Sequence, residues 1–453
     1  MNPYKENSNF RKPPAWFRAL NNIWKGTYPI GTRIRLDKDD LIKSARKMTG
    51  LHDLGKDFHD EPLERLLKSI NEEANLHPIG RFITKQRFVS LLNIRLRAEY
   101  FFTENPAILE QELYPVWIII GLQRTGTTKL HRLLACDPDH RVIPSWEVIN
   151  PVPMDLSYFK NYELRITNYE NQDKEPNREK REARSEWPEA RSQKPEADKK
   201  RIAVGRMSAN ALKIMSPGFF AIHPIEVMEP EEDILLLDVS FMSTTAEAMM
   251  QVPSYAQWLE NTDQSDAYAY CAKLLKFLQW MKPAKRWVLK TPHHLEFPDL
   301  IAKHFGEVHF LWPHRTLYES VPSFLSMVTY NQMIFSDQVD LDAIGRHWVR
   351  KTGYMLDQTL KYRSKEGNEK KFTDIYYQNL IKDSMGELSK IYSLNGGLNQ
   401  ELIQRFETHE KEHPHRKYGT HSYSLADFNL IEGDIDKQTA NYQQFMKAHY
   451  GRT

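Results

Sequence analysis

Hydrophobic and polar positions divide the chain into a helical first quarter and a longer part in which strands and helices alternate. Between residues 51 and 98, apolar side chains recur at helical spacing, for example at Leu63, Leu66, Leu67 and Ile70. No strand pattern interrupts this stretch. We therefore expect residues 1–112 to form an N-terminal helical region that packs on a second unit, residues 113–453.

Short apolar runs in the second unit are typical of buried parallel strands, and helical patterns follow them. The predicted strands are 116–120, 287–290 and 308–312, and the predicted helices are 129–136, 266–281, 294–305 and 320–328. This alternation favours an α/β fold, with a parallel sheet flanked by helices. Right-handed crossovers would bring the carboxyl ends of the strands to one edge, where ligands of such sheets bind.

One segment of the second unit lacks a core pattern. From about 170 to 201 nearly every residue is charged or polar, and Trp187 is the only aromatic one. Such a segment cannot bury apolar surface, so we predict a charged, exposed insertion at about 165–201. It is either a spacer or a lid over a site.

Composition narrows the class of protein. A hydrophobic content of 40% and a net charge of +2 across 453 residues are ordinary for a globular protein and argue against wholesale nucleic-acid binding. Two cysteines offer no disulfide framework, and neither an apolar leader nor a run of about 18 apolar residues is found. The sequence predicts a cytoplasmic protein without a membrane span and leaves its oligomeric state open.

The first predicted strand runs into a glycine-containing loop, Gly121-Leu-Gln-Arg-Thr-Gly-Thr-Thr128. Its spacing equals that of a P-loop, GxxxxGK[ST], and it lies between a strand and a helix, as that motif requires. Glycines let the backbone curl so that amide N–H groups surround an anion, and the following helix dipole adds to the attraction. The loop is therefore a candidate anion site.

The loop departs from a nucleotide triphosphatase in one informative position. Thr127 stands where the lysine that reaches the β- and γ-phosphates would be, and positive charge comes earlier, at Arg124. The best candidate for a magnesium-binding aspartate is Asp238, but we expect a helix to start in that segment. The pattern fits an anion that needs no metal, and a 5′-phosphosulfate meets that description.

GLQRTGTT resembles the 5′-phosphosulfate loop of sulfotransferases, usually PRSGTT or PRTGTT, and two further elements extend the resemblance. Arg315 and Ser323 have the eight-residue spacing of the family's 3′-phosphate segment, and Lys290 lies where related enzymes have a lysine before a proline. Other segments are similar to the large bacterial sulfotransferases, so the resemblance covers nearly the whole chain: residues 50–53, 255–259 and 419–423. Gln123 and Thr316 depart from the usual proline and aspartate, but neither removes a phosphate ligand.

This resemblance implies transfer of a sulfuryl group from 3′-phosphoadenosine-5′-phosphosulfate (PAPS) to a hydroxyl group, in residues 113–453. The residues expected to bind the donor are Arg124, Thr125, Gly126, Thr127, Thr128, Arg315 and Ser323. Arg124 and Lys290 would stabilise the charge that develops on the departing 5′-phosphate. Arg315 suits a doubly charged 3′-phosphate, because its planar fork binds two oxygens at once.

Two residues are candidates for the general base, and the sequence leaves both open. Glu147 lies shortly after the phosphate-loop helix, where the related tyrosylprotein sulfotransferases have a glutamate, with a spacing that differs by a couple of residues. His223 is the rival, because cytosolic sulfotransferases use a histidine and its ordinary pKa suits the task. His293 and His294, beside Lys290, are candidates for lining the acceptor pocket or for capping the next helix.

Two other functions compete with sulfuryl transfer. A P-loop nucleotide kinase or triphosphatase would require magnesium-dependent ATP binding, and a non-catalytic member of the fold would bind the nucleotide without turnover. The acceptor is expected to be a small molecule with a hydroxyl group. Phenols, sterols, lipids and sugars all fit that description.

Overall fold

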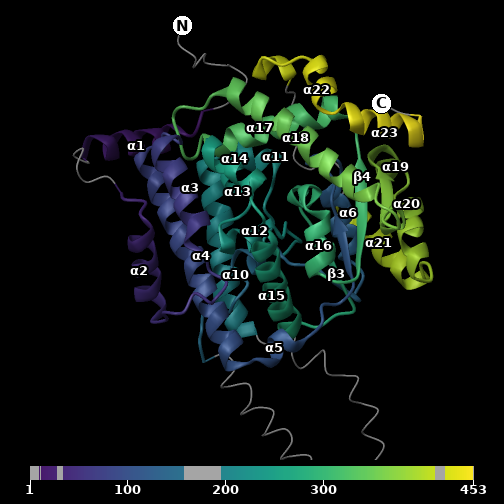
Figure 1. Ribbon diagram of the computed structural model, residues 1–453, viewed down its shortest axis with the longest axis horizontal. Coiled ribbons are helices and arrows are strands. Elements are labelled where there is room, and N and C mark those ends of the chain that lie inside the picture. Colours follow the sequence, from purple (N-terminus) through teal and green to yellow (C-terminus); the bar gives the residue numbers. More distant parts are fainter. Residues whose placement is uncertain (1–9, 11, 28–33, 158–194, 414–423, 452–453) are drawn as a thin grey trace, which may run out of the picture.

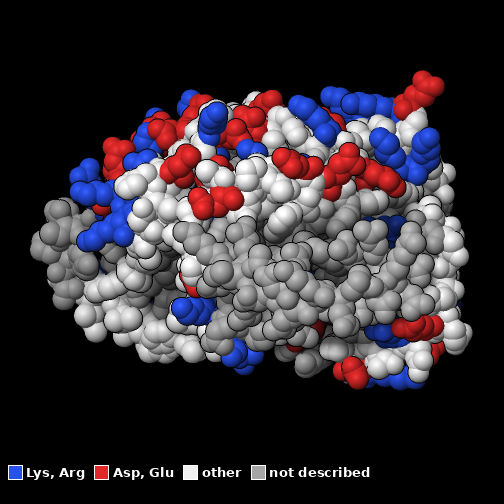
Figure 2. All heavy atoms as spheres, turned by 90° about the horizontal axis from the view of Figure 1, so that it is seen from below, with Lys and Arg blue, Asp and Glu red and all other residues white. Residues whose placement is uncertain are grey.

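The computed structural model describes residues 10, 12–27, 34–157, 195–413 and 424–451, which form a central sheet enclosed by helices (Figure 1). Residues 165–194 of the predicted insertion and the motif at 419–423 lie outside the described residues. No helix within the described ranges is long and apolar enough to cross a membrane. Basic and acidic side chains lie interleaved along the upper rim of the face shown in Figure 2.

The sheet has five parallel strands in the order β2-β3-β1-β4-β5. The strands are β1 (Val116–Ile119), β2 (His140–Arg141), β3 (Arg286–Lys290), β4 (Val308–His314) and β5 (Phe372–Tyr376). The predicted α/β class and the three predicted strands, which are β1, β3 and β4, are confirmed. Register places Ile119 beside both Lys290 and Leu311, so the carboxyl ends of the three central strands reach one edge together.

The continuous apolar pattern of β1 is explained by burial on both faces of the sheet. Val116 and Ile118 belong to a core that includes α4 (Pro78–Glu104) and α15 (Ser265–Met281). Trp117 and Ile119 belong to a second core with α6 (Thr127–Leu134) and α20 (Ser384–Tyr392). Helices therefore cover both faces, as a parallel sheet requires. The two edge strands, β2 and β5, were not predicted, because one has two residues and the other carries an aspartate at its centre.

The N-terminal region is helical, as predicted. It comprises α1 (Ala15–Thr27), α2 (Lys38–Thr49), α3 (Asp60–Glu72), α4 (Pro78–Glu104) and α5 (Ala107–Glu110). The long helix α4 contributes Phe88, Leu92 and further side chains to the core that also contains sheet residues. On the same helix, the Arg95 guanidinium lies 3.8 Å from the ring centroid of Tyr270. The described part of the N-terminal region and the sheet thus share one core.

One predicted helix and the end of the predicted insertion need correction. The predicted helix at 294–305 is divided into η3 (Pro292–Glu296) and α16 (Pro298–His304), because Phe297 precedes a proline and leaves the helical region. The end of the predicted insertion is also wrong, since α10 (Pro195–Met215) begins at residue 195 and Arg201 is buried. Its guanidinium covers Trp146 and donates a hydrogen bond to the Asn150 carbonyl, which is why a charged residue belongs to the core here.

The remaining helices complete the two layers and the sheet edge. They are α6 (Thr127–Leu134), α7 (Ser145–Ile149), α11 (Pro217–Ile222), α12 (Ile234–Leu237), η2 (Asp238–Ser240), α13 (Thr245–Met249), α14 (Pro253–Asn261), α15 (Ser265–Met281), α17 (Leu317–Gln332), α18 (Leu341–Arg363), η4 (Glu369–Lys371), α19 (Tyr377–Lys382), α20 (Ser384–Tyr392), η5 (Ser393–Asn395), α21 (Gln400–Glu412), η6 (Leu425–Phe428), α22 (Glu432–Gln438) and α23 (Ala440–Tyr450).

Candidate functional site

The loop between β1 and α6 has the curled backbone that its glycines predict. Gly126 has a φ of 89° and is the N-cap of α6, and Arg124 also has a positive φ, 67°. A Cβ atom on Gly121 would lie 2.8 Å from Thr125 Oγ1, so the loop closes tightly on its own strand. The Thr125 hydroxyl fixes this closure by donating to the Leu122 carbonyl at 2.7 Å. At the helix N-terminus that follows, Thr127 is buried and Thr128 is exposed.

Three of the predicted phosphate ligands contact one another although they come from different elements. Arg124 Nε donates to Ser323 Oγ at 3.2 Å, and Arg315 Nη1 donates to the Arg124 carbonyl at 2.8 Å. The Arg315 guanidinium also pairs with Glu319, in the first turn of α17, at 2.7 Å. Two arginines therefore lie together, and the exposed Glu319 pairs with one of them.

A tyrosine that the sequence did not single out joins the loop to Arg315. The ring centroid of Tyr377 lies 4.2 Å from the Arg315 guanidinium, close enough for a cation–π interaction. A Cβ atom on Gly126 would lie 2.9 Å from Tyr377 Cδ2. Tyr377 follows β5, so its position could be inferred only once β5 was known to lie next to β4.

Lys290 ends β3 and is buried, with its ammonium group 2.8 Å from Glu232 Oε1. The next acid, Asp233, accepts the backbone N–H of Lys290 at 3.0 Å and lies 2.7 Å from His294 Nε2. The other nitrogen of His294 contacts the Tyr268 hydroxyl at 2.9 Å. Two consecutive acids thus fix both the side chain and the main chain of Lys290.

His223 lies at the same edge as the arginines. Arg124 Nη1 donates to the carbonyl of Ile222, the residue before His223. His223 Nε2 is 3.6 Å from Glu231 Oε1, and its side chain is 27% exposed. Burial opposes ionisation of Glu231, but the charges of His223 and Lys290 outweigh it and lower its pKa to about 2. A permanently ionised carboxylate therefore faces a half-buried imidazole.

Glu147 has a different environment. Its carboxylate accepts a hydrogen bond from Arg141 Nη2 at 2.6 Å, and both side chains are buried. The Arg141 guanidinium in turn covers the ring of Trp287, near the start of β3, whereas Lys290 ends that strand. Within the described residues, the hydrogen bonds and ion pair of Glu147 join it to Arg141 and to its own helix turn, and none joins it to the loop. The structure brings together all the predicted site residues except Glu147.

The acids at 231–233 are the main part of the cluster that the sequence did not reveal. They precede α12, which starts at Ile234, so the predicted start of a helix there is confirmed. The one signal was their density in Glu229-Pro-Glu-Glu-Asp233. Asp238, the candidate magnesium ligand, instead pairs with Arg87 and accepts the Ser243 hydroxyl. Among the described residues, no three His, Cys, Asp or Glu side chains are arranged to hold a metal ion.

The histidines after Lys290 are buried rather than open to the edge. His293 lies 3.3 Å from the Thr244 hydroxyl, and its ring is parallel to that of Tyr268.

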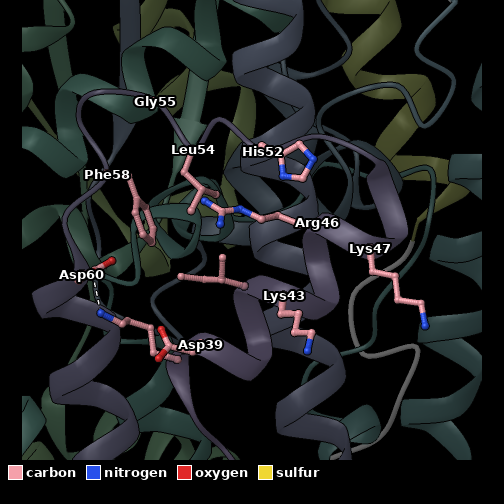
Figure 3. A pocket seen from close by; sticks show the side chains of 11 residues that line it. Asp39, Lys43, Arg46, Lys47, His52, Leu54, Gly55, Phe58 and Asp60 are labelled. Atoms are coloured by element: carbon pink, nitrogen blue, oxygen red, sulfur yellow. Dashed lines mark hydrogen bonds and ion pairs between the residues drawn. The ribbon is translucent and has the colours of Figure 1, made fainter.

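A hollow of about 760 Å³ lies elsewhere, between α2 and the loop before α3, with Lys43, Arg46 and Phe58 in its wall (Figure 3). None of the residues described above at the carboxyl ends of the strands lines this hollow, so the hollow is not part of the candidate site.

Comparison with known proteins agrees with this architecture. A profile of the sulfotransferase family matches residues 115–396, which contain every predicted site residue. The sulfotransferase STF1 from Mycobacterium tuberculosis is 26% identical, with a TM-score of 0.70 over 90% of this chain and 99% of that one. STF9 from Mycobacterium avium, 21% identical, shares the fold with a TM-score of 0.74 over 92% of this chain and 98% of that one. No curated protein matches the chain. The chain belongs to the sulfotransferase family.

Proposed function

We propose that this protein transfers a sulfuryl group from PAPS to a hydroxyl group of a small-molecule acceptor. The observation that carries the proposal is the direct linkage of two candidate anion sites. Arg315 donates to the backbone of Arg124, and Arg124 donates to Ser323. A donor with a phosphosulfate at one end and a 3′-phosphate at the other requires two anion sites at a fixed separation.

The loop residues would hold the 5′-phosphosulfate. Gly126 supports this assignment, because a side chain there would collide with Tyr377 and fill the space in front of the N-terminus of α6. The amides at the start of α6 and the hydroxyls of Thr127 and Thr128 supply donors, and the helix N-terminus favours negative charge. Thr125 contributes its amide, since its hydroxyl is used within the loop.

Arg315 and Ser323 would hold the 3′-phosphate. Arg315 is paired with Glu319, whose side chain is 59% exposed. Such an exposed pair is worth about 0–1 kcal/mol, whereas a bidentate arginine–phosphate contact is charge-assisted and stronger. We therefore expect the phosphate to displace Glu319. The ring of Tyr377 would keep the guanidinium plane in place during the exchange.

Lys290 and Arg124 would stabilise the charge that develops on the 5′-phosphate as the sulfuryl group leaves. Sulfuryl transfer resembles phosphoryl transfer, an in-line displacement governed by positioning and electrostatics. Lys290 suits this task because Glu232 and Asp233 fix its ammonium and its backbone before the donor enters. These two side chains would neutralise the developing charge without a metal ion.

His223 is favoured over Glu147 as the base that accepts the acceptor's proton. The imidazole is partly exposed and lies next to Arg124 along the chain of contacts, and Glu231 would stabilise the imidazolium that forms. Glu147 is already paired with Arg141. That contact occupies the carboxylate, and a reaction that protonated it would leave the buried Arg141 without its partner.

Two alternatives have less support. A magnesium-dependent kinase or triphosphatase would need a loop lysine and a free aspartate, but Thr127 replaces the former and Asp238 is bound to Arg87. A non-catalytic protein would have the same donor site without turnover.

The free cysteines Cys136 and Cys271 support the proposal of a reducing, cytoplasmic compartment.

Calorimetry with 3′-phosphoadenosine-5′-phosphate (PAP) tests the donor site. We expect wild-type protein to bind PAP and Arg315→Ala to bind it at least about tenfold more weakly, since a charge-assisted contact is lost. Arg346→Ala is a matched control, because Arg346 pairs with Asp342 on the exposed side of α18. Absence of binding to the wild type, or equal binding by Arg315→Ala, would refute the site.

Turnover distinguishes an enzyme from a binding protein with the same fold. With PAPS and a panel of phenol, sterol and sugar acceptors, Arg124→Ala and Lys290→Ala should lower the rate at least about a hundredfold. Both variants should keep the far-ultraviolet circular dichroism of the wild type. Wild-type rates in both variants would contradict the assigned roles.

A further inference from the structure

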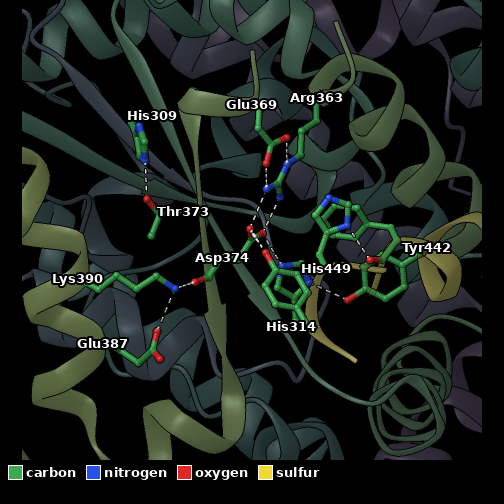
Figure 4. Close-up of polar contacts among 12 residues, drawn as sticks. His309, His314, Arg363, Glu369, Thr373, Asp374, Glu387, Lys390, Tyr442 and His449 are labelled. Carbon is green, nitrogen blue, oxygen red and sulfur yellow. Dashed lines mark hydrogen bonds and ion pairs between the residues drawn. The ribbon is translucent and has the colours of Figure 1, made fainter. Parts of the chain in front are cut away.

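A buried carboxylate lies directly behind the candidate 3′-phosphate site. Asp374, in β5, accepts Arg363 Nη1 at 2.6 Å and Arg363 Nη2 at 2.8 Å, and it contacts His314 Nε2 at 2.8 Å (Figure 4). The hydroxyl of Tyr450 donates to the same carboxylate. Four donors thus occupy its two oxygens, and all but Tyr450 are almost fully buried.

His314 is held from both sides of its ring. Because a carboxylate only accepts, Nε2 carries the proton and donates to Asp374. Nδ1 then accepts the hydroxyl of Tyr442, which lies 2.8 Å away. Burial lowers the pKa of His314 and so keeps the ring in this neutral form, although Asp374 opposes the shift. One orientation of the ring satisfies both contacts.

This network determines the surroundings of Arg315 from two directions. His314 is the last residue of β4 and immediately precedes Arg315. Asp374 lies three residues before Tyr377, whose ring carries the Arg315 guanidinium. The register of β4 and β5 joins the two, since His314 pairs with Tyr376. A change at Asp374 or His314 would therefore move both the backbone that leads into Arg315 and the Tyr377 ring that packs on its guanidinium.

Two hydroxyl groups of this network, one bound to Asp374 and one to His314, come from α23. Tyr442 and Tyr450 both belong to α23, which also packs Phe445 on Trp312 of β4 with ring centroids 5.8 Å apart. Burying an ion pair costs desolvation, and apolar residues in its place would often be as stable. Such a network can instead select one geometry of the strand ends.

We propose that Tyr442 and Tyr450 are positioning residues, through which α23 and the His314–Asp374 pair hold Arg315 in the geometry that recognises the 3′-phosphate of the donor. The inference rests on the proposed function. It makes the C-terminal helix a determinant of specificity for nucleotides that carry a 3′-phosphate. Nucleotides without that group should not depend on the two hydroxyls.

The test compares PAP with adenosine 5′-monophosphate, which lacks only the 3′-phosphate. Dissociation constants for both are measured by calorimetry on the wild type, Tyr442→Phe, Tyr450→Phe and the double variant. We expect the double variant to bind PAP about five- to tenfold more weakly and to bind the monophosphate as the wild type does. Tyr354→Phe is the matched control, because Tyr354 lies on α18 and its hydroxyl donates to the Glu260 carbonyl of α14, outside this network.

Each outcome decides between the proposals. A double variant that keeps the wild-type preference for PAP overturns the inference, and so does one that loses affinity for both nucleotides equally. Arg315→Ala should abolish the preference and thereby sets the scale of the full effect. A wild-type protein without any preference for PAP would instead overturn the proposed donor, and the inference with it.

Discussion

Lys290 and Arg315 are both cations at the sheet edge, and each forms an ion pair with a glutamate. The two ion pairs differ in how far they are exposed to water. The side chain of Lys290 is 2% exposed and its partner Glu232 is 24% exposed, whereas those of Arg315 and Glu319 are 22% and 59% exposed. Water screens the outer pair and leaves the inner pair stronger. We infer that Arg315 exchanges its partner when an anion binds and that Lys290 stays in place.

Replacing His223 and Glu147 separately should identify the base. His223→Asn should lower the turnover number about a hundredfold and remove the acidic limb of the pH–rate profile. Glu231 does not produce that limb, because its lowered pKa of about 2 keeps it ionised throughout the assay. Its ionisation stabilises the fold above about pH 4.5 and loses that effect only as the pH falls towards 2, so assays above pH 5 are unaffected.

Glu147→Gln should have the opposite profile. It leaves the buried Arg141 without a carboxylate, so we expect the free energy of unfolding to fall by about 3 kcal/mol, measured by urea denaturation. Turnover at a temperature where the variant is folded should stay within about twofold of the wild type. A large loss of turnover in Glu147→Gln, with His223→Asn unaffected, would reverse the assignment.

At the scale of elements, the sheet edge is built from pieces that are distant in sequence. β1 supplies the loop, β3 supplies Lys290, β4 supplies Arg315 and β5 leads into Tyr377. These ends meet because all the strands are parallel and in register. The loop after one strand therefore limits the space left for the loops after the neighbouring strands. Gly126, after β1, is the clearest case, because it lies against Tyr377, after β5.

Gly126→Ala should be more harmful than the same change at Gly367. Both glycines have a positive φ, 89° and 78°, so alanine pays about 1 kcal/mol or more of backbone strain at either position. Only at Gly126 does the new Cβ also collide with Tyr377, while Gly367 has open space around it. We expect Gly126→Ala to lose PAP binding in calorimetry and Gly367→Ala to retain it. Equal affinities would contradict the steric argument.

At the scale of the whole molecule, the N-terminal helices and the sheet cannot be separated cleanly. Their shared core contains Phe88 and Leu92 of α4 together with Leu274 and Phe277 of α15, and Arg87 of α4 forms an ion pair with the buried Asp238. A chain that begins at residue 113 would expose the apolar face of α15. The division at residue 112 is thus proposed as a boundary in sequence rather than between independent folding units.

Thermal unfolding tests this proposal. We expect the full chain to unfold in one transition that is the same by near- and far-ultraviolet circular dichroism, since one core responds as a unit. Residues 113–453 expressed alone should be insoluble or lack a cooperative transition. Two separate transitions in the full chain, or a soluble fragment that melts cooperatively, would contradict a shared core.

Local pattern was sufficient for the central strands and for the phosphate loop. β1, β3 and β4 are buried on both faces, so their apolar runs are visible in the sequence, and the curl before α6 follows from glycine at fixed spacing. β5 was missed because Asp374 interrupts its apolar pattern. That aspartate is tolerated only because Arg363, His314 and Tyr450 surround it.

The sequence by itself determined the α/β class, the family and the order of the anion-binding elements, because these depend on residues close together along the chain. Only the tertiary structure decided which charges face one another. It paired Glu147 with Arg141 and set Glu231 and Glu232 against His223 and Lys290. It also brought the ring of Tyr377 to Arg315 and the Tyr442 hydroxyl of α23 to His314. Such pairings depend on distances between strand ends and packed helices, which sequence separation does not encode.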